Sequence, residues 1–342
     1  MLINRTKVSR LEYSQFLLVT QKNYTLTYFA EHSESISHDA INRYLSREKL
    51  TPTLLWEHQK NEIVSSVKGL IIFDDSVLDK THSEFIELSK WQYSGAVKDI
   101  VKGIGMVTCA YYNPEIKKFW AIDYRIYAPE QDGKTKINHV LDMLNSLVYS
   151  KKLEFHTVLM DTWYATTEII LTIDSLGKIF YCPIRKNRLV SKTDQKYHHI
   201  PVVDLPCSAD ELSHGQRIHI NKFPKNYQAQ LFRITVNSHR TDFIVTNDKA
   251  QKTSKDIQEV YGYRWCIEEL HRELKQLTGI QNCQCRKERI QRNHIACSFM
   301  VWARLKSVAY KINRTIYHVK NHLLNDYIKQ QLRSPTISMA FA

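Results

Sequence analysis

The stretch from residue 67 to residue 184 alternates short apolar runs with longer amphipathic segments, and this order limits the folds open to the chain. Three β-branched apolar runs predict strands: VKGLIIFDDSVL, VKGIGMVTCAYY and KKFWAIDYRIY. The remainder predicts a helix in INHVLDMLNSLVYS, a strand in FHTVLMDTWY, a helix in ATTEIILTIDSLGK and a strand in IFYCPI. This order predicts an α/β fold with a mixed sheet flanked by helices.

The segments on either side of this core have a different character. SHDAINRYLSREKL, which starts at Ser37, has helical spacing and predicts a helical N-terminal domain. Alternating runs such as AQLFRITV predict a β-rich insertion, and after it one helix is expected from Ser254 to Thr278. We therefore expect five segments, with a C-terminal helix and tail at the end: 1–65, 66–185, 186–250, 251–305 and 306–342.

Charge and composition bound the class of partner. The 48 Lys and Arg residues against 35 Asp and Glu give a net charge of +13, which favours a polyanion such as nucleic acid over a membrane surface. Seven scattered cysteines do not form a disulfide framework. We find neither a signal peptide nor an apolar run of ~20 residues, so we expect a cytoplasmic protein without membrane spans.

Two of the predicted strands run into aspartates. Asp74, with Asp75 beside it, follows LIIF, and Asp161 follows TVLM. The carboxyl ends of strands in open α/β sheets are where active sites usually lie. An aspartate at a strand end also serves simply to cap the turn that follows. Strand alternation points Asp74 and Asp75 to opposite sides, so either one is a candidate ligand.

A third carboxylate comes from the helical stretch YGYRWCIEELHRELKQ, residues 261–276. With Glu268 as the origin, a helical turn of about 100° per residue places Tyr261 near +20°, Arg264 near −40° and Lys275 near −20°. The apolar residues of the stretch cluster on the opposite side. An ordinary exposed salt bridge between Arg264 and Glu268 is one interpretation. A stripe that faces phosphate also accounts for the tyrosine.

Three carboxylates from two strands and a helix suit a divalent cation. Mg²⁺ prefers oxygen ligands and keeps water or phosphate in its remaining positions. Two such ions, about 3.5–4 Å apart, would activate a hydroxyl nucleophile and stabilise the leaving oxygen of a phosphodiester. The basic charge of the chain would then hold the nucleic acid that is cut.

These residues carry a resemblance to a known family. The pattern YxxRxxxExxxxxxK, an Asp-x-Ser motif on the first strand and an Asp-x-Trp-Tyr motif after a later strand are similar to those of bacterial insertion-sequence DDE transposases, which have an RNase H-like core. The resemblance covers roughly residues 67 to 300. The matching positions are Tyr261, Arg264, Glu268 and Lys275 for the first pattern, Asp74-Asp75-Ser76 for the second and Asp161-Thr162-Trp163-Tyr164 for the third.

The resemblance implies a DNA transposase that binds terminal inverted repeats and performs Mg²⁺-dependent cleavage and strand transfer. Asp74, Asp161 and Glu268 would hold two Mg²⁺ ions, with Mn²⁺ as a substitute. The implied partners are double-stranded DNA, as element ends and target, and a second copy of the chain on that DNA. Neither a nucleotide nor a membrane is expected, and the protein would act at the nucleoid. The alternatives are an RNase H-like nuclease without strand transfer and a non-catalytic DNA-binding regulator.

Further basic residues are candidates for DNA contacts. Tyr261, Arg264 and Lys275 would grip phosphates beside the cut. Farther along the chain, three arginines at intervals of three residues predict a basic stripe on a helix. The N-terminal helix carries two arginines that would either read DNA or only pack within a helical bundle. These candidates are Arg286, Arg289, Arg292, Arg43 and Arg47.

Three other patterns have a less specific meaning. Asp132-Gly133-Lys134-Thr135 lacks the first glycine of a phosphate loop, so ATP binding is not expected. Asp123 and Arg125 share a strand face and predict a structural ion pair. The C-x-C spacing of the group made by Cys283, Cys285, His294 and Cys297 is not typical of a zinc site.

Overall fold

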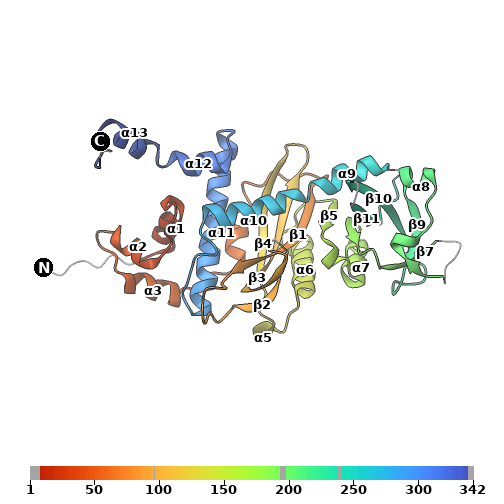
Figure 1. The fold of residues 1–342 in the computed structure, drawn as a ribbon, viewed down its shortest axis with the longest axis horizontal. Helices are drawn as coiled ribbons and strands as arrows, with labels where there is room; N and C mark the ends of the chain where they lie inside the picture. The colour runs from red at the N-terminus through yellow and green to blue at the C-terminus, as the bar shows by residue number, and fades with distance from the viewer. Residues whose placement is uncertain (1–7, 96, 193–197, 238–239, 251, 338–342) are drawn as a thin grey trace, which may run out of the picture. The chain divides into compact units, whose positions relative to one another are not determined.

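The computed structural model describes residues 8–95, 97–192, 198–237, 240–250 and 252–337 (Figure 1). The chain divides into two compact units, and the boundary between them falls inside two strands and one helix. Unit 1 consists of Met1–Glu62, Leu78–Ile104 and Leu270–Ala342, and unit 2 consists of Ile63–Val77 and Gly105–Glu269. The five predicted segments remain a prediction, since their boundaries are a different division of the chain.

A mixed sheet forms the core of unit 2, in the order β4-β3-β1-β5-β6. Strand β1 is parallel to β5, β5 is parallel to β6, and β3 is antiparallel to β4. The first four residues of β1 and all of β5 are buried, as expected for apolar strands covered on both faces. The strands are β1 (Leu70–Asp79), β3 (Asp99–Asn113), β4 (Lys118–Ile126), β5 (Thr157–Met160) and β6 (Ile179–Ile184).

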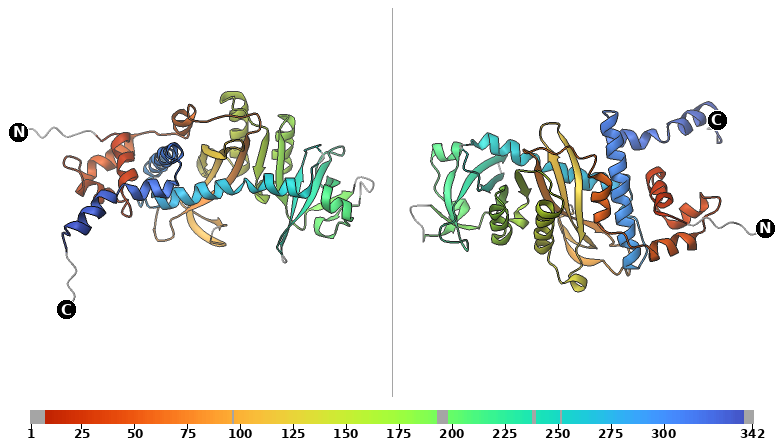
Figure 2. Two further views of the ribbon diagram at one scale, coloured as in Figure 1. Left: turned by 90° about the horizontal axis from the view of Figure 1, so that it is seen from above. Right: turned by 180° about the vertical axis from the view of Figure 1, so that it is seen from behind.

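Two helices of unit 2 lie beside this sheet, α6 (Lys136–Asn145) and α7 (Thr167–Ser175) (Figures 1 and 2). Each begins at a threonine whose hydroxyl accepts a backbone N–H three residues on. Helix α7 ends before Gly177, whose φ of +67° lies in the left-handed region that glycine adopts without strain. A short helix α5 (Pro129–Asp132) and the turn η1 (Ser146–Ser150) flank α6.

The β-rich insertion extends the same sheet beyond β6 in the order β11-β10-β9-β7-β8, with antiparallel pairing throughout. The fold class expected from the sequence is therefore confirmed: a mixed sheet flanked by helices, with a β-rich insertion before the last helices. The insertion contains β7 (Leu189–Lys192), β8 (Ile200–Pro201), α8 (Ala209–His214), β9 (Gln216–Ile220), β10 (Ala229–Asn237) and β11 (Arg240–Thr246).

The single helix predicted from Ser254 to Thr278 is wrong. Two helices, α9 (Ser254–Gly262) and α10 (Trp265–Leu277), are separated by a tight turn. In this turn the N–H of residue 264 bonds to the carbonyl of residue 261 at 3.0 Å, three residues back rather than four. Arg264 therefore lies in the turn itself, between Tyr261 on α9 and Glu268 on α10.

Unit 1 is mainly helical, and α11 (Glu288–Lys311) is its central element. Helices α1 (Arg10–Val19), α3 (His38–Arg47) and α4 (Thr53–Gln59) pack against α11, and α2 (Leu26–Glu31) packs against α3. Figure 2 shows the first three of these helices beside α11. A hairpin pairs β2 (Lys90–Ser94), a strand that the sequence did not predict, with the start of β3. The chain ends in α12 (Ile316–His322) and α13 (Asn325–Arg333).

Among the described residues, no helix combines the length and the apolar character needed to cross a bilayer.

Candidate active site

Asp74 lies in the middle of β1 and not at its end, because the strand continues to Asp79. Its side chain is 15% exposed. One carboxylate oxygen accepts the backbone N–H of Asp75 at 2.8 Å, and the other accepts Nη1 of Arg264 at 3.1 Å. This carboxylate is therefore held on both oxygens by groups of unit 2.

Asp75 has different partners, as expected for the next residue of a strand. Its Oδ2 forms an ion pair with Nζ of Lys136 at 2.6 Å, and its Oδ1 accepts the hydroxyl of Tyr164 at 3.1 Å. Burial and the nearby carboxylates raise the pKa of Tyr164, so its hydroxyl stays protonated and donates. No sequence pattern marks Lys136, whereas Tyr164 stands in the quoted Asp-x-Trp-Tyr motif.

Asp161 follows β5 directly. The parallel register pairs Phe73 of β1 with Met160 of β5, so Asp74 and Asp161 are the next residue on neighbouring strands. Asp161 then caps the short helix η2 (Thr162–Tyr164), where its Oδ1 accepts the N–H of Thr162 at 2.6 Å. The capping role and a place at the end of a parallel strand are thus both observed for Asp161.

Arg264 bridges two of the three predicted ligands. Its guanidinium donates from Nη1 to Asp74 and from Nη2 to Oε1 of Glu268. It also lies 5.8 Å from the centre of the Tyr261 ring, a cation–π distance. Burial lowers the pKa of Arg264, but Tyr261, Asp74 and Glu268 together raise it above its usual range, so the guanidinium is a permanent cation here.

Several carboxylates lie close together at this point of unit 2, and the pKa of one of them, Asp74, is perturbed. Burial raises the pKa of Asp74 to about 7; Asp75 and Asp161 add to this rise, while Arg264 and the Asp75 N–H oppose it. The pKa of Asp74 is thus raised mainly because the carboxyl group is buried, with two further acids close to it. Such a perturbed group in a cluster of acids is typical of a functional site.

The candidate site offers the kind of ligand atoms that a divalent cation binds. Asp74, Asp161 and Glu268 supply oxygen donors, which Mg²⁺ prefers, and the buried Asp74 carboxylate shares its one ion-pair partner, Arg264, with Glu268. In the part of the chain that the structure describes, no group of three or more His, Cys, Asp or Glu side chains is already arranged as a metal site. The guanidinium of Arg264 takes the shared position between Asp74 and Glu268 instead.

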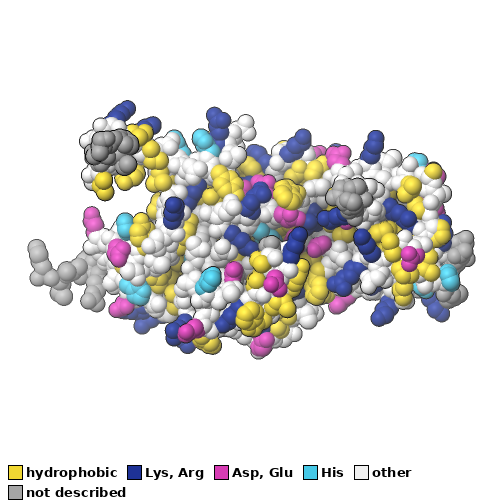
Figure 3. Space-filling view, viewed as in Figure 1, with side chains coloured by type: hydrophobic (Ala, Val, Ile, Leu, Met, Phe, Trp, Pro, Cys, Tyr) yellow, Lys and Arg dark blue, Asp and Glu magenta, His cyan; other side chains and the backbone are white. Residues whose placement is uncertain are grey.

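The predicted DNA contacts do not all belong to this site. Lys275 lies on the part of α10 that belongs to unit 1, where burial lowers its pKa and Asp79 opposes that shift. Arg43 and Arg47 are exposed on α3. Figure 3 shows further Lys and Arg side chains of unit 2 over α7, β5 and β11.

The predicted basic stripe at residues 286–292 needs a correction. Helix α11 begins at Glu288, so Arg286 lies before it and does not share a helical face with Arg289 and Arg292. Arg286 and Arg289 are exposed, and Arg292 forms an ion pair with Glu288 at 2.5 Å. The stripe is therefore shorter than expected, because the chain enters the helix two residues later.

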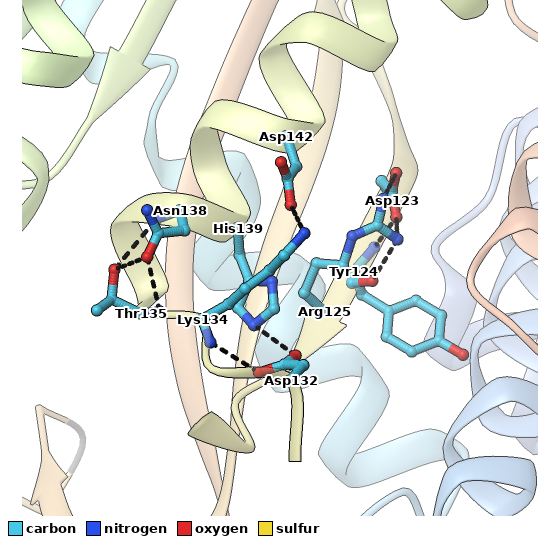
Figure 4. A network of polar contacts seen from close by, with 9 residues as sticks. All are labelled: Asp123, Tyr124, Arg125, Asp132, Lys134, Thr135, Asn138, His139 and Asp142. Atoms are coloured by element: carbon cyan, nitrogen blue, oxygen red, sulfur yellow. Dashed lines mark hydrogen bonds and ion pairs between the residues drawn. The ribbon is translucent and has the colours of Figure 1, made fainter. Parts of the chain in front are cut away.

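The ion pair predicted between Asp123 and Arg125 is confirmed. Nη1 and Nη2 of Arg125 bond to the two carboxylate oxygens at 2.8 and 3.1 Å, and Lys151 adds a third contact at 3.0 Å. Figure 4 shows this pair near the loop that resembles half a phosphate-binding motif. There, Lys134 pairs with Asp142 at 2.6 Å.

His294, the histidine of the group considered for zinc, is held by hydrogen bonds within the protein. Burial lowers the pKa of His294 to about 4, which keeps the ring neutral. Its Nε2–H donates to the Gly279 carbonyl at 2.9 Å, and its Nδ1 accepts the Tyr13 hydroxyl at 2.8 Å. Both ring nitrogens are thus engaged, and neither is free for a metal.

Comparison with known proteins supplies the family. Two solved structures align with the chain at low identity: a piggyBac transposase synaptic complex with hairpin DNA (TM-score 0.49, 11% identity, 96% of this chain and 73% of that chain) and a Drosophila P element transposase strand transfer complex (TM-score 0.28, 12% identity, 95% and 64%). No curated protein matches. The family model described as the transposase DDE domain matches residues 66–304, more than half of the sequence, and the chain therefore belongs to this transposase family.

Proposed function

We propose that this chain is an insertion-sequence transposase that binds the terminal inverted repeats of its element and cuts and rejoins DNA with Mg²⁺. The observation that carries the proposal is the cluster in which Arg264 joins Asp74 to Glu268 beside Asp161. In a chain of the DDE family, an acidic cluster of this kind supports chemistry on phosphodiesters. We expect it to act on DNA in the cytoplasm, at the nucleoid of a bacterial cell.

Three carboxylates are proposed to hold the metal: Asp74, Asp161 and Glu268. Bound Mg²⁺, or Mn²⁺ in its place, would supply Lewis acidity and an activated hydroxyl. Asp74 is the better candidate than Asp75, because Asp75 is already bound by Lys136 and Tyr164.

The proposed reaction has two balanced steps. Water attacks a phosphorus at the element end, the bond to the 3′ oxygen breaks, and the element keeps a 3′ hydroxyl while the released flank keeps the 5′ phosphate. The 3′ hydroxyl then attacks a phosphorus of the target, and the target strand leaves as a new 3′ hydroxyl. Arg264 is suited to stabilise the negative charge of either transition state, because it is a fixed cation at the carboxylates.

The remaining basic residues are proposed to bind double-stranded DNA through its phosphates. Two ends must be joined in transposition, so we also propose a homodimer on DNA. The proposed DNA contacts are Tyr261, Arg264, Lys275, Arg286, Arg289, Arg292, Arg43 and Arg47.

The experiment is a strand-transfer assay with DNA that carries the inverted repeats flanking the gene, a supercoiled plasmid and Mg²⁺. We expect labelled ends to appear in the plasmid. Glu268→Gln should abolish both cutting and joining while DNA binding persists, and the neighbouring Glu269→Gln serves as the matched control. Cutting without joining would instead identify a nuclease, and binding without cutting a regulator. Normal cutting by Glu268→Gln would overturn the site.

A separate measurement addresses the phosphate contacts. Lys275→Ala is expected to weaken DNA binding and to reduce the slope of log affinity against log salt by about 1, as for loss of one phosphate contact. Binding isotherms at several salt concentrations give this slope. An unchanged slope would remove Lys275 from the DNA-binding surface.

A further inference from the structure

One guanidinium serves two carboxylates at the candidate active site. Nη1 of Arg264 donates to Oδ2 of Asp74 at 3.1 Å, and Nη2 of Arg264 donates to Oε1 of Glu268. Both contacts are ion pairs, and all three side chains are partly exposed to solvent. An oxygen of each of these two proposed metal ligands is therefore held by Arg264.

The other acids of the cluster do not depend on Arg264. Oδ1 of Asp161 accepts the N–H of Thr162, and among the described residues its Oδ2 has neither a hydrogen bond nor an ion pair. Asp75 has a cation of its own, Lys136. Arg264 is thus the cation that joins two of the three proposed metal ligands, while the third keeps one oxygen open.

A guanidinium beside a metal ligand acts in one of two opposite ways. It supports the metal when it bonds to a lone pair that the metal does not use, and loss of such a partner lowers metal affinity about 10- to 100-fold. It competes with the metal when it lies between the ligands, because two cations at the same carboxylates repel each other. Arg264 lies between Asp74 and Glu268 and bonds to both, which favours competition.

The position of Arg264 in the chain allows its side chain to move without loss of secondary structure. The residue lies in the turn between α9 and α10, outside both helices. Its backbone N–H bonds to the carbonyl of Tyr261 at 3.0 Å, a contact that does not involve the side chain. The Tyr261 ring, 5.8 Å from the guanidinium, offers a cation–π contact that does not depend on either carboxylate.

We propose that Arg264 competes with divalent metal for Asp74 and Glu268, so that metal binds tightly only when the guanidinium has moved away. The proposal rests on the proposed function for the identity of the metal site. A phosphate of the DNA strand is the group that takes up the moved guanidinium, through two parallel N–H···O bonds. Metal and DNA therefore favour each other's binding by one common factor.

This competition also joins the two interpretations that the sequence left open for Arg264. An ion pair with Glu268 and a contact with phosphate are then two positions of one side chain. The first is the arrangement observed, and the second follows when metal takes the carboxylates.

The first test is calorimetric titration of the full-length protein with Ca²⁺, which also takes oxygen ligands, without DNA and without turnover. Arg264→Ala is expected to bind Ca²⁺ at least about tenfold more tightly than the native chain, because two charge-assisted hydrogen bonds no longer have to break. Arg264→Lys keeps the charge but loses the planar fork and should fall between the two. Asp161→Asn should weaken binding in either background, which identifies the site that is titrated.

The matched control is Lys136→Gln. It removes one positive charge from the same cluster, since Lys136 pairs with Asp75 at 2.6 Å, but leaves both contacts of Arg264 in place. A gain in Ca²⁺ affinity of less than about threefold is expected, as for a charge that acts only through space and is screened by salt. Equal gains in Lys136→Gln and Arg264→Ala would overturn the competition and leave general electrostatics as the cause. Circular dichroism of each variant checks its folding.

The guanidinium itself is observed by NMR of protein that carries isotope-labelled arginine. The Nε–H signal of Arg264 is identified by its absence from Arg264→Lys, and it should move as Ca²⁺ is added. A signal that stays in place while Ca²⁺ binds would overturn the proposal.

The link to DNA is tested by the same titration with a duplex of the inverted repeat present. DNA should raise the Ca²⁺ affinity by a larger factor in the native chain than in Arg264→Ala, because the variant has no guanidinium left to move. Equal factors in the two proteins would overturn this link.

Two results separate the competition from the proposed function. Weaker Ca²⁺ binding by Arg264→Ala, with the dependence on Asp161 retained, would make the arginine a support of the metal; this would overturn the competition and leave the proposed function intact. Absence of Ca²⁺ binding from the native chain and from every variant would overturn the metal site and the competition together.

Discussion

Two aspartates on strands of the same sheet in unit 2, with β3 between those strands, begin from the same local geometry and end in opposite electrostatic states. Asp74 on β1 and Asp123 on β4 each accept the N–H of the next residue at 2.8 Å. Asp123 has a side chain that is 4% exposed and two cations of its own, Arg125 and Lys151. Asp74 shares a single cation, Arg264, with Glu268 and has two further acids nearby.

The difference shows what separates a structural carboxylate from a candidate ligand. Asp123 has two cations around it, Arg125 (Figure 4) and Lys151, so the carboxylate is complete without any added ion. Around Asp74 the carboxylates outnumber the cations. Burial is the main cause of the rise of its pKa to about 7, Asp75 and Asp161 add to the rise, and Arg264 opposes it. The separation in sequence between an aspartate and its cationic partner does not distinguish the two cases. The number of cations that contact each carboxylate does.

The largest expected effect comes from Asp74→Asn. It should reduce cleavage by more than the roughly 10- to 100-fold that loss of an outer-shell partner of a metal site costs. Folding should not suffer, because the change removes a buried charge among like charges. Single-turnover cleavage and urea unfolding of the same sample give the two values. Normal cleavage by Asp74→Asn would break the comparison.

The same variant carries a pH signature in metal-free buffer. The pKa of Asp74 is about 7 in the folded chain against an ordinary value of 3.8, so the folded state binds the extra proton in this interval. Ionisation therefore costs stability above pH 7 and nothing below about pH 4. Asp74→Asn should be the more stable protein above pH 7, and the gap should close near pH 4. A difference in the free energy of unfolding that does not change with pH would mean that a group other than Asp74 causes it.

Asp123→Asn is expected to act in the opposite way. It leaves Lys151, which is 9% exposed, without its carboxylate, and loss of one partner from a buried pair costs about 3 kcal/mol. The free energy of unfolding should fall by this order, measured with urea at pH 7, while cleavage per folded molecule stays normal. Stability equal to that of the native protein would mean that water replaces the carboxylate.

The smallest effect is predicted for Asp142→Asn. Asp142 pairs with Lys134 at 2.6 Å, but both side chains are nearly half exposed, 45% and 46%. Exposed pairs contribute about 0–1 kcal/mol, so the free energy of unfolding should change by less than ~1 kcal/mol. This variant calibrates the other two: a larger loss here would show that charge changes near α6 act on folding in general.

Much of the fold was predictable because its signals are local. Apolar runs of four or more residues gave β1, β5 and β6, and the 3.6-residue period gave α6 and α7. The acidic residues after LIIF and TVLM could be placed together because parallel strands share one edge of a sheet. β2 was missed because its aromatic residues Trp91 and Tyr93 are exposed and it forms a short edge strand.

The relations between distant residues could not be predicted. The ion pair of Asp75 with Lys136 joins positions 61 residues apart, and no local pattern marks it. The break between α9 and α10 was also invisible, since a turn with bonds three residues back leaves the apolar spacing almost unchanged. The predicted proximity of Arg264 and Glu268 is nevertheless observed, because Arg264 in the turn forms an ion pair with Glu268.

The break between α9 and α10 changes the position of Glu268 along its helix. In one continuous helix Glu268 would lie in the middle, away from the partial charges that the backbone dipoles produce at the two helix ends. Because α10 begins at Trp265, Glu268 lies in its first turn, at the end where the aligned peptide dipoles make a helix positive. A negative side chain in the first turn of a helix stabilises that helix, by about 0.3–1 kcal/mol at exposed positions. Gly262, where an added Cβ would meet nothing within 4 Å, is therefore a position from which Gly262→Ala would test whether a longer α9 weakens this field.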